Sequence, residues 1–256
     1  MSCPSGSYRV DIVGAIAASA FENCDSLVSV TIGPNVTSIG NWAFYDCDSL
    51  SSVSIGDSVS SIGERAFAYC GSLGSVTIGD SVTSIGSGAF YRCDSLSSVT
   101  IGDSVTSIGE RAFAYCGSLT GISVSSANPA FCCQGGVLFN KEMSTLVQFP
   151  GGVGGDYRIP DSVTSIGSYA FENCGKLEYV VYAGAAAPQC GSSVFSGTAA
   201  SAVHVVSGYV GTSVCGVGVI GDYVRASCGF SVHGVGRFGV GSRVALWCSV
   251  FVYSVV

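Results

Sequence analysis

Cysteine is the residue type in this sequence that is most able to do chemistry. The 256-residue chain contains 13 cysteines, a number that can indicate a disulfide framework in a small secreted chain. Six of them recur at one position of a repeated segment, which favours a structural role: Cys24, Cys47, Cys70, Cys93, Cys116 and Cys174. We expect these six to form a buried column of thiols, each donating a weak hydrogen bond to the backbone.

Neighbouring cysteines of this column would be close enough for a disulfide, but the direction of their side chains disfavours one. Adjacent Cα atoms would lie ~4.8 Å apart, which is within disulfide range, but parallel side chains do not suit the dihedral angle of a disulfide. The adjacent pair Cys132 and Cys133 is predicted to be unpaired rather than redox-active. The sequence has no C-x-x-C motif and gives no indication of a zinc site or another metal site.

Other signals for catalysis or cofactor binding are sparse. The two histidines are His204, on a predicted closing strand, and His233, in a tail rich in Val and Gly; neither is set among the partners that nucleophilic catalysis needs. Two G-x-G-x-x-G matches, at 216–221 and 234–239, do not open an amphipathic helix as nucleotide binding requires. We therefore predict no enzyme activity, no cofactor and no bound nucleotide.

Low charge limits the classes of partner. Charged residues make up 11% of the chain, against ~25% in typical domains, and 10 Lys and Arg are outnumbered by 17 Asp and Glu. The resulting net charge of −7 opposes binding to a phosphate backbone, which needs clustered cations. We predict that nucleic acid is not a partner.

The cysteines belong to a repeated unit of 23 residues. The same interval separates the aromatic residues Phe44, Phe67, Phe90 and Phe113, and Phe171 occupies the same position in a later unit. The unit reads L-x-x-V-x-I-G-x-x-V-x-x-I-G-x-x-A-F-x-x-C-x-x, and a fixed period with this pattern indicates a leucine-rich repeat solenoid. We predict a mostly β fold of 23-residue rungs, each rung being one turn of the coil, with a short helical or 3-10 turn at each Ala-Phe pair.

Alternation along each strand sends every second side chain outward. Within residues 50–55, Val53 and Ile55 point to the interior, so Ser52 and Ser54 point to solvent. The equivalent outward hydroxyls are our candidate binding residues: Ser29, Thr31, Ser52, Ser54, Ser75, Thr77, Ser98 and Thr100. A solvated face of β-favouring residues, an uncharged contact face for a protein or glycan, and an ice-binding array all fit this pattern.

The regular repeat stops after Leu119. Apolar runs on either side of residues 140–144 predict a β-hairpin within one long repeat at about 122–160. Lys141 and Glu142, at the polar tip of this hairpin, are candidate binding residues because they break the symmetry of the array. We expect the solenoid to cover residues 10–215, with a closing strand at about 194–210, and we assign no structure to the Val/Gly-rich segment 216–256.

These features together resemble the BspA-type leucine-rich repeat family. The resemblance is carried by the S-V-T-S-I-G-x-x-A-F-x-x-C core, by the long unit that begins at Asn128-Pro129, and by the closing segment that ends at Gly208-Tyr209. It implies a surface-displayed, non-enzymatic protein that adheres to host matrix proteins or cells. The chain departs from the family pattern at Val206, where family members usually have Pro.

The ends of the chain give no export or anchoring signal. The apolar residues 10–21 lack the basic region that opens a signal peptide. The apolar residues 244–256 are fewer than the ~17–25 that a membrane-spanning helix needs. Surface display is therefore implied by the resemblance, and a cytoplasmic location is the alternative.

Two functional hypotheses follow. The first is a non-catalytic cell-surface or secreted protein that mediates protein–protein contacts or adhesion to host cells or matrix. The alternative is an intracellular leucine-rich repeat scaffold that binds a protein ligand, which suits the many unpaired thiols because cytosolic thiols stay reduced.

Overall fold

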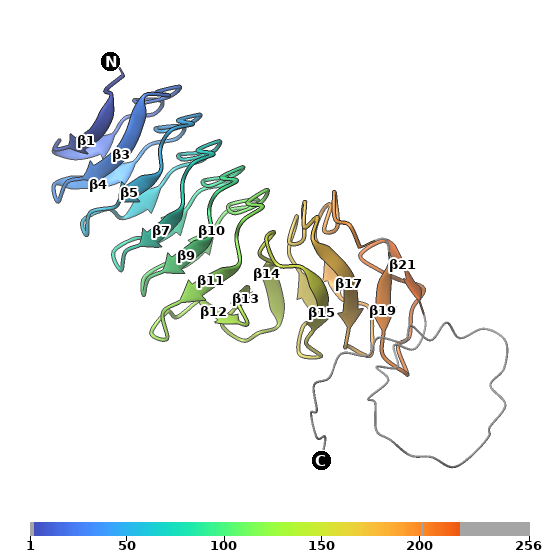
Figure 1. The fold of residues 1–256 in the computed structure, drawn as a ribbon. Helices are drawn as coiled ribbons and strands as arrows, with labels where there is room; N and C mark the ends of the chain where they lie inside the picture. The colour runs from blue at the N-terminus through green and yellow to red at the C-terminus, as the bar shows by residue number, and fades with distance from the viewer. Residues whose placement is uncertain (1–2, 201, 221–256) are drawn as a thin grey trace, which may run out of the picture.

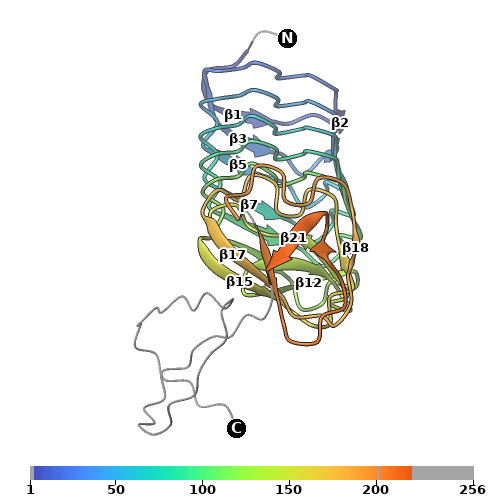
Figure 2. The ribbon, with the colours of Figure 1, turned by 90° about the vertical axis from the view of Figure 1, so that its right-hand side faces the viewer.

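The protein is a coil of stacked rungs. A computed structural model describes residues 3–200 and 202–220. Figure 1 shows the rungs following one another in chain order from the N-terminus, and Figure 2 shows the N-terminal rungs stacked one above another. The predicted leucine-rich repeat β-solenoid is confirmed.

The regular rungs build two parallel β faces. The first, called here the strand face, contains β1 (Gly6–Val10), β3 (Leu27–Ile32), β5 (Ser52–Ser54), β7 (Ser75–Ile78), β9 (Ser98–Ile101) and β11 (Gly121–Val124). The second contains β2 (Gly14–Ile16), β4 (Val36–Ile39), β6 (Ser61–Ile62), β8 (Ser84–Ile85) and β10 (Ser107–Ile108). Because the period is constant, like residues pair across rungs, as in Val76 with Val99 and Ile62 with Ile85.

The long repeat and the C-terminal rungs supply the remaining strands. The long repeat holds β12 (Phe131–Gln134), β13 (Val137–Asn140) and β14 (Thr145–Gln148). The later rungs hold β15 (Gly155–Ile159), β16 (Ser165–Ile166), β17 (Leu177–Tyr182), β18 (Gln189–Cys190), β19 (Val203–Val205), β20 (Ser213–Val214) and β21 (Val217–Ile220). β1 thus begins upstream of the predicted start at residue 10, and β21 pairs with β19 beyond the predicted end at 215; residues 221–256 lie outside the described part of the chain.

The turn around each Phe is not helical. The N–H groups of Trp42, Phe44 and Asp46 donate to carbonyl groups of the next rung at 2.8, 2.7 and 2.9 Å. Trp42 and Asp46 have φ values of 62° and 57°, which interrupt any run of helical dihedrals. The helical or 3-10 turn that the sequence suggested at each Ala-Phe pair is therefore not formed in the described residues, because these N–H groups bond between rungs instead of within one.

A single stack of phenylalanines fills the centre of the regular rungs. The ring centroids of Phe44, Phe67, Phe90 and Phe113 are separated by 5.1, 5.3 and 5.6 Å, with planes within 8° of parallel. Each ring is at most 1% exposed. Phe21 extends the stack at 5.0 Å from Phe44. Stacked aromatic pairs add ~0.5–1.5 kcal/mol each beyond their burial, so the stack ties every rung to its neighbours.

A second stack fills the later rungs. Phe171 lies between Phe149 and Phe195, with centroids 5.2 and 5.0 Å away. Phe149 belongs to the long repeat, and its N–H donates to the Ala170 carbonyl at 2.8 Å as the repeat phenylalanines do. Phe149 follows Phe113 by 36 residues, an interval that does not fit the period of 23, so the repeat spacing does not predict Phe149 at this position.

The long repeat joins two hydrophobic cores. Asn128 stands 23 residues after Val105 and is fully buried; its side chain donates to two backbone carbonyls of the previous rung and accepts from two N–H groups of its own loop. The chain then leaves the coil as the antiparallel strands β12, β13 and β14. Along β13, Leu138 packs into the N-terminal core, whereas Val137 and Phe139 pack into the C-terminal core.

The hairpin predicted around residues 140–144 corresponds to β13 and β14. β12 and its connection through Gly135 and Gly136 were not predicted. Both glycines have positive φ (59° and 81°), and an added Cβ on Gly136 would lie 3.0 Å from the Cα of Gly121. The tight turn therefore requires glycine. This turn brings the antiparallel strands β12 and β13 against the last regular rung.

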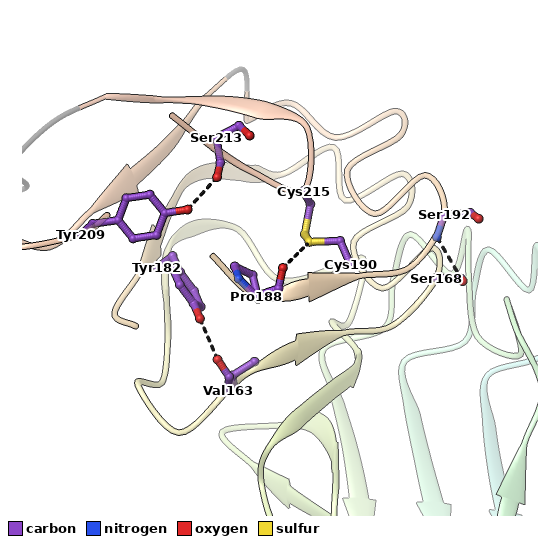
Figure 3. The surroundings of a disulfide bond; sticks show 9 residues. All are labelled: Val163, Ser168, Tyr182, Pro188, Cys190, Ser192, Tyr209, Ser213 and Cys215. Atoms are coloured by element: carbon purple, nitrogen blue, oxygen red, sulfur yellow. Dashed lines mark hydrogen bonds between the residues drawn. A yellow bond between two sulfur atoms is a disulfide. The ribbon is translucent and has the colours of Figure 1, made fainter. Parts of the chain in front are cut away.

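Two disulfides close the first and last described rungs. Cys3 is bonded to Cys24, and Cys190 is bonded to Cys215. The prediction of a free thiol at Cys24 is therefore wrong, because the Cα atom of Cys3 lies 5.2 Å from that of Cys24 and the two cysteines are bonded. Figure 3 shows the second disulfide beside Tyr209, whose hydroxyl donates to the Ser213 carbonyl at 2.6 Å.

Substituting Phe67, in the middle of the first stack, tests the stacked core. Phe67→Ala removes two ring contacts and leaves a cavity, so we expect it to lower the free energy of unfolding by about 3–5 kcal/mol. Phe195→Ala is the matched control, because Phe195 ends its stack and is only partly buried; its loss should be less than half as large. Urea denaturation of both variants measures the difference, and equal losses would contradict a continuous central stack.

Candidate functional site

The predicted hydroxyl residues lie in two columns on the strand face. Ser29, Ser52, Ser75 and Ser98 form the first column, and Thr31, Ser54, Thr77 and Thr100 form the second; within each column neighbours are paired by β3–β5 and β7–β9. β5 and β7 belong to separate sheets, but their rungs are joined beside the strands, where the Gly74 N–H donates to the Ser51 carbonyl at 3.1 Å. We call these eight residues the hydroxyl columns.

The hydroxyl columns are open to solvent. Ser29 donates to Ser7 at 2.8 Å, and the other seven side chains are exposed and have no hydrogen bond to the described residues. A second set of hydroxyls behaves differently: Ser60, Thr83 and Thr106 donate to backbone carbonyls of the preceding rung at 2.9, 3.0 and 3.3 Å. This second set is therefore used in holding the rungs together, whereas the columns can bond to a ligand.

The hairpin tip is partly structural. The Lys141 ammonium donates to the carbonyls of Ser126 and Asn128 at 3.2 and 2.6 Å, and Glu142 accepts from the Asn140 amide at 3.1 Å. Lys141 thus pins the tip to the loop before β12. Of the two residues, Glu142 is more available to bind a ligand through its charge, because the hydrogen bond that it accepts comes from a neutral amide.

The thiol column has a structural geometry. Cys47, Cys70, Cys93 and Cys116 donate to phenylalanine carbonyls of the preceding rung at 3.1, 3.2, 3.1 and 3.2 Å. Cys174 lies 4.0 Å from the Phe149 carbonyl. Burial raises the pKa of Cys116 and of Cys174 to about 12 and raises that of Cys93 well above its usual value. Because the thiolate is the reactive form, Cys93, Cys116 and Cys174 are poor nucleophiles at neutral pH. Cys47 differs, because a hydrogen bond with Cys70 lowers its pKa, and its protection comes from burial.

An aromatic stripe runs along the turns, and the sequence analysis missed it. The rings of Trp42, Tyr45, Tyr69, Tyr91 and Tyr115 touch in this order, with centroids 4.9, 5.3, 5.6 and 5.2 Å apart. All five are half-buried. We call these five residues the aromatic stripe. The tyrosines alternate between one and two residues after each Phe, so no single repeat position carries them; their contact follows from the stacking of the turns.

Two arginines lie over rings of the stripe, and a third, Arg111, occupies the same repeat position as Arg65. Arg65 lies over Trp42 at 4.9 Å. Arg92 lies 5.7, 5.9 and 4.9 Å from the ring centres of Tyr69, Tyr91 and Tyr115, and hydrogen bonding to Tyr91 raises the pKa of Arg92. Guanidinium groups at these distances are attracted to the ring faces.

The third arginine, Arg111, is tied into the structure. Its guanidinium donates to both carboxylate oxygens of Glu172 at 2.8 and 2.9 Å and lies 3.6 Å over Tyr169. The Glu172 side chain is 3% exposed. We call this bidentate ion pair the Arg111–Glu172 fork. It crosses the turn of the long repeat, which is shorter than the others: Phe149 follows Leu146 by three residues, whereas Phe113 follows Ile108 by five. The hydrogen bond to Glu172 raises the pKa of Arg111.

The short turn leaves a hollow of about 140 Å³ between the two cores. Arg111 and Phe113 line one side, and Val147, Gln148 and Ser168 line the other. Ligand pockets usually enclose ~300–1,000 Å³, so this hollow is small for a substrate. Gln148 also donates to the Phe149 and Ala170 carbonyls at 3.0 and 3.2 Å, which gives it a structural task.

Comparison with known proteins agrees with this geometry. The sequence matches the BspA type leucine rich repeat region in 6 copies, over residues 13–131 and 155–210. The chain belongs to the BspA-type leucine-rich repeat family. Members of this family are generally non-catalytic binding scaffolds. A comparison with curated proteins gives no match to the chain.

Solved bacterial structures share the fold of this BspA-type chain. A leucine-rich repeat protein from Eubacterium ventriosum is 21% identical, with a TM-score of 0.60 over 82% of this chain and 70% of that one. The pneumococcal vaccine antigen PcpA is 16% identical, with a TM-score of 0.55 over 86% and 76%. A leucine-rich cell surface protein from Faecalibacterium prausnitzii is 23% identical, with a TM-score of 0.51 over 84% and 80%. At these identities the likeness concerns the fold.

The other candidates of the sequence analysis form no site in the described part of this BspA-type chain. His204 lies on β19 with its ring 5.6 Å from that of Tyr179, and His233 lies outside the described residues. The first G-x-G-x-x-G match begins in the turn between β20 and β21, and the second lies outside the described residues. Among residues 3–200 and 202–220 there is no cluster of His, Cys, Asp and Glu able to hold a metal and no helix long and apolar enough to cross a membrane.

Alkylation with iodoacetamide tests the state of the cysteines. At about pH 8 without reductant, Cys133, which among residues 3–200 and 202–220 is the free cysteine exposed to solvent, should react in the folded protein. The buried thiols should react only after unfolding: Cys47, Cys70, Cys93, Cys116 and Cys174. Cys3, Cys24, Cys190 and Cys215 should need prior reduction. Peptide mass mapping identifies the labelled sites, and labelling of Cys116 in folded protein as fast as Cys133 would contradict the buried column.

The Arg111–Glu172 fork is tested against a matched position. Arg111→Ala leaves a buried carboxylate without its cation, and we expect it to lower the free energy of unfolding by about 2–3 kcal/mol. Arg65→Ala, at the same repeat position, removes only an exposed guanidinium over Trp42 and should cost about 0.5 kcal/mol. Urea denaturation compares the two, and equal losses would show that the fork does not hold the two cores together.

Proposed function

We propose that this protein is a non-catalytic cell-surface or secreted adhesion protein that binds a protein ligand through the exposed faces of its solenoid. The observation that carries the proposal is the pair of hydroxyl columns, whose seven exposed side chains have no hydrogen bond to the described residues. They stand in register on a face of parallel strands. A regular array of this kind offers hydrogen bonds to an extended partner surface and does not enclose a small substrate.

A location outside the reducing cytosol is supported by the disulfides. Cys3–Cys24 and Cys190–Cys215 join the two ends of the coil to their neighbouring segments. Disulfides persist in oxidising compartments and are rare in the cytosol. The fold is also that of a pneumococcal vaccine antigen and of a leucine-rich cell surface protein, which favours the same location for this chain.

The hairpin tip is a second proposed contact. Glu142 is exposed on the connection between β13 and β14, where the long repeat breaks the symmetry of the regular rungs. We assign the contact to Glu142 rather than to Lys141, because Lys141 is used in two hydrogen bonds to the loop before β12.

The rival function is an intracellular scaffold that binds a protein ligand. The five buried thiols of the column suit that function, but their burial also protects them in an oxidising compartment, so they do not favour it. Protease treatment of intact cells separates the two hypotheses, because a surface protein is cleaved and an intracellular scaffold is not.

Solid-phase binding of the full chain tests the proposed adhesion. We expect saturable binding to at least one of a panel of immobilised matrix proteins or to intact host cells. The double variant Ser75→Asp/Ser98→Asp places charge on the hydroxyl columns and should weaken binding at least ten-fold. Thr83→Ser is the control, because it keeps the hydroxyl that bonds to Ser60 and lies in the second set. Absence of saturable binding to every matrix protein and cell type in the panel would reject adhesion.

A further inference from the structure

We propose that the aromatic stripe and Arg92 form a second interaction surface, which binds an acidic segment of a protein partner. This inference rests on the proposed function, since it names a surface and a ligand chemistry for the same adhesion protein. It concerns the turns of the coil and is separate from the hydroxyl columns, which lie on the strands.

The residue types of the stripe are those that concentrate binding energy. Tyr, Trp and Arg dominate the energetic centres of protein interfaces because they combine large contact area with a polar group and little entropy to lose. Here one tryptophan and four tyrosines form an unbroken row of ring contacts across successive rungs. Packing against each other holds the rings in place before any partner arrives.

Arg92 supplies the charge that selects an acidic ligand. Its guanidinium is exposed and is centred among Tyr69, Tyr91 and Tyr115. Within the described residues no carboxylate forms an ion pair with it, whereas Arg111 is paired with Glu172. A carboxylate of the partner can therefore bind Arg92 in the bidentate manner that guanidinium favours.

The charges at the other end of the stripe set the direction of binding. Near Tyr45 the pKa of Asp46 is raised first by burial and then by the charges of Asp48, Asp25 and Glu22, so this end of the stripe carries negative charge. Arg65 lies over Trp42 at the same end and offsets only part of the charge of these carboxylates, so we expect an acidic segment to favour the half that contains Arg92. We therefore place the acidic residues of the partner over Tyr69, Tyr91 and Tyr115.

The tilt of the rings favours a peptide over a sugar. Adjacent tyrosines are inclined at 57–63° to one another, so they form no flat platform on which successive sugar rings could stack. The guanidinium of Arg92 also occupies the space over the ring faces. This uneven surface fits a peptide better. An acidic side chain can place its carboxylate on Arg92 and its apolar atoms against the ring edges.

A phage-displayed library of random 12-residue peptides tests the proposal with the full chain as bait. We expect the selected peptides to be enriched in Asp and Glu and to bind several-fold more weakly as salt rises to about 0.5 M, since exposed charges are screened. Fluorescence anisotropy of one selected peptide then measures the variants. Arg92→Asn should weaken binding at least ten-fold, and Arg92→Lys should recover part of the loss.

The substitution to Asn is chosen to preserve the fold. Arg92 has a φ of 57°, and the equivalent positions in other rungs hold Asn23 and Asn173 with φ of 56° and 57°. Arg158→Asn removes the same charge from the exposed side of β15 and is the matched control. Circular dichroism and the thermal midpoint of each variant exclude loss of structure as the cause.

The outcomes separate this inference from the proposed adhesion. If wild-type protein binds peptides or matrix proteins and Arg92→Asn binds them equally well, the surface is wrong and the adhesion proposal stands. Selected peptides without acidic residues, or binding of sulfated or uronic-acid glycans that is lost in Arg92→Asn, would overturn the assignment of the ligand. Absence of any binding by the wild-type chain rejects both proposals.

Discussion

The structure depends on the exact repetition of the turn that contains each Phe. In that turn alternate N–H groups bond to the carbonyls of the following rung, and the Phe ring lies on the ring below it. Both interactions require that the same repeat position lies directly above its equivalent in every successive rung. The glycine that follows the second strand obeys the same constraint, since a Cβ on Gly86 would lie 2.5 Å from the Glu64 nitrogen. No rung can satisfy these bonds alone, so stability is shared along the array.

The long repeat shows how the coil tolerates a break in this rule. Its turn is shorter, and polar bonds replace the contacts that are lost. Asn128 donates to the Gly102 and Val105 carbonyls of the last regular rung. Arg111 donates to the Glu172 carboxylate on the other side of the short turn. Strand β13 shares its side chains between the two cores. The break therefore joins two stacks of rungs, and among the described residues it holds the one ion pair whose carboxylate is buried.

Regular stacking also turns single side chains into continuous surfaces. One serine on a strand has little binding capacity, but the same serine in successive rungs makes a column at the spacing of paired strands. The aromatic stripe arises in the same way from residues on successive turns. The two surfaces differ in chemistry, because the columns offer neutral hydroxyl groups and the stripe offers ring edges and the exposed guanidinium of Arg92. A chain with few charges can thus present two distinct faces to a partner.

The sequence by itself determined the coil, the inward positions of Phe, Val, Ile and Cys, and the outward hydroxyls, because each of these follows from a period of 23 residues and from alternation along a strand. Tertiary structure alone decided which cysteines are bonded: Cys24 has the repeat spacing of a column thiol, yet it pairs with Cys3 at the end of the coil. It also decided that Phe149 fills a repeat position, that Lys141 is structural and that the tyrosines touch. All of these features are contacts between residues at different positions of the repeat. A period in the sequence determines that equivalent repeat positions stack on one another, but it does not determine which residues at different repeat positions come into contact.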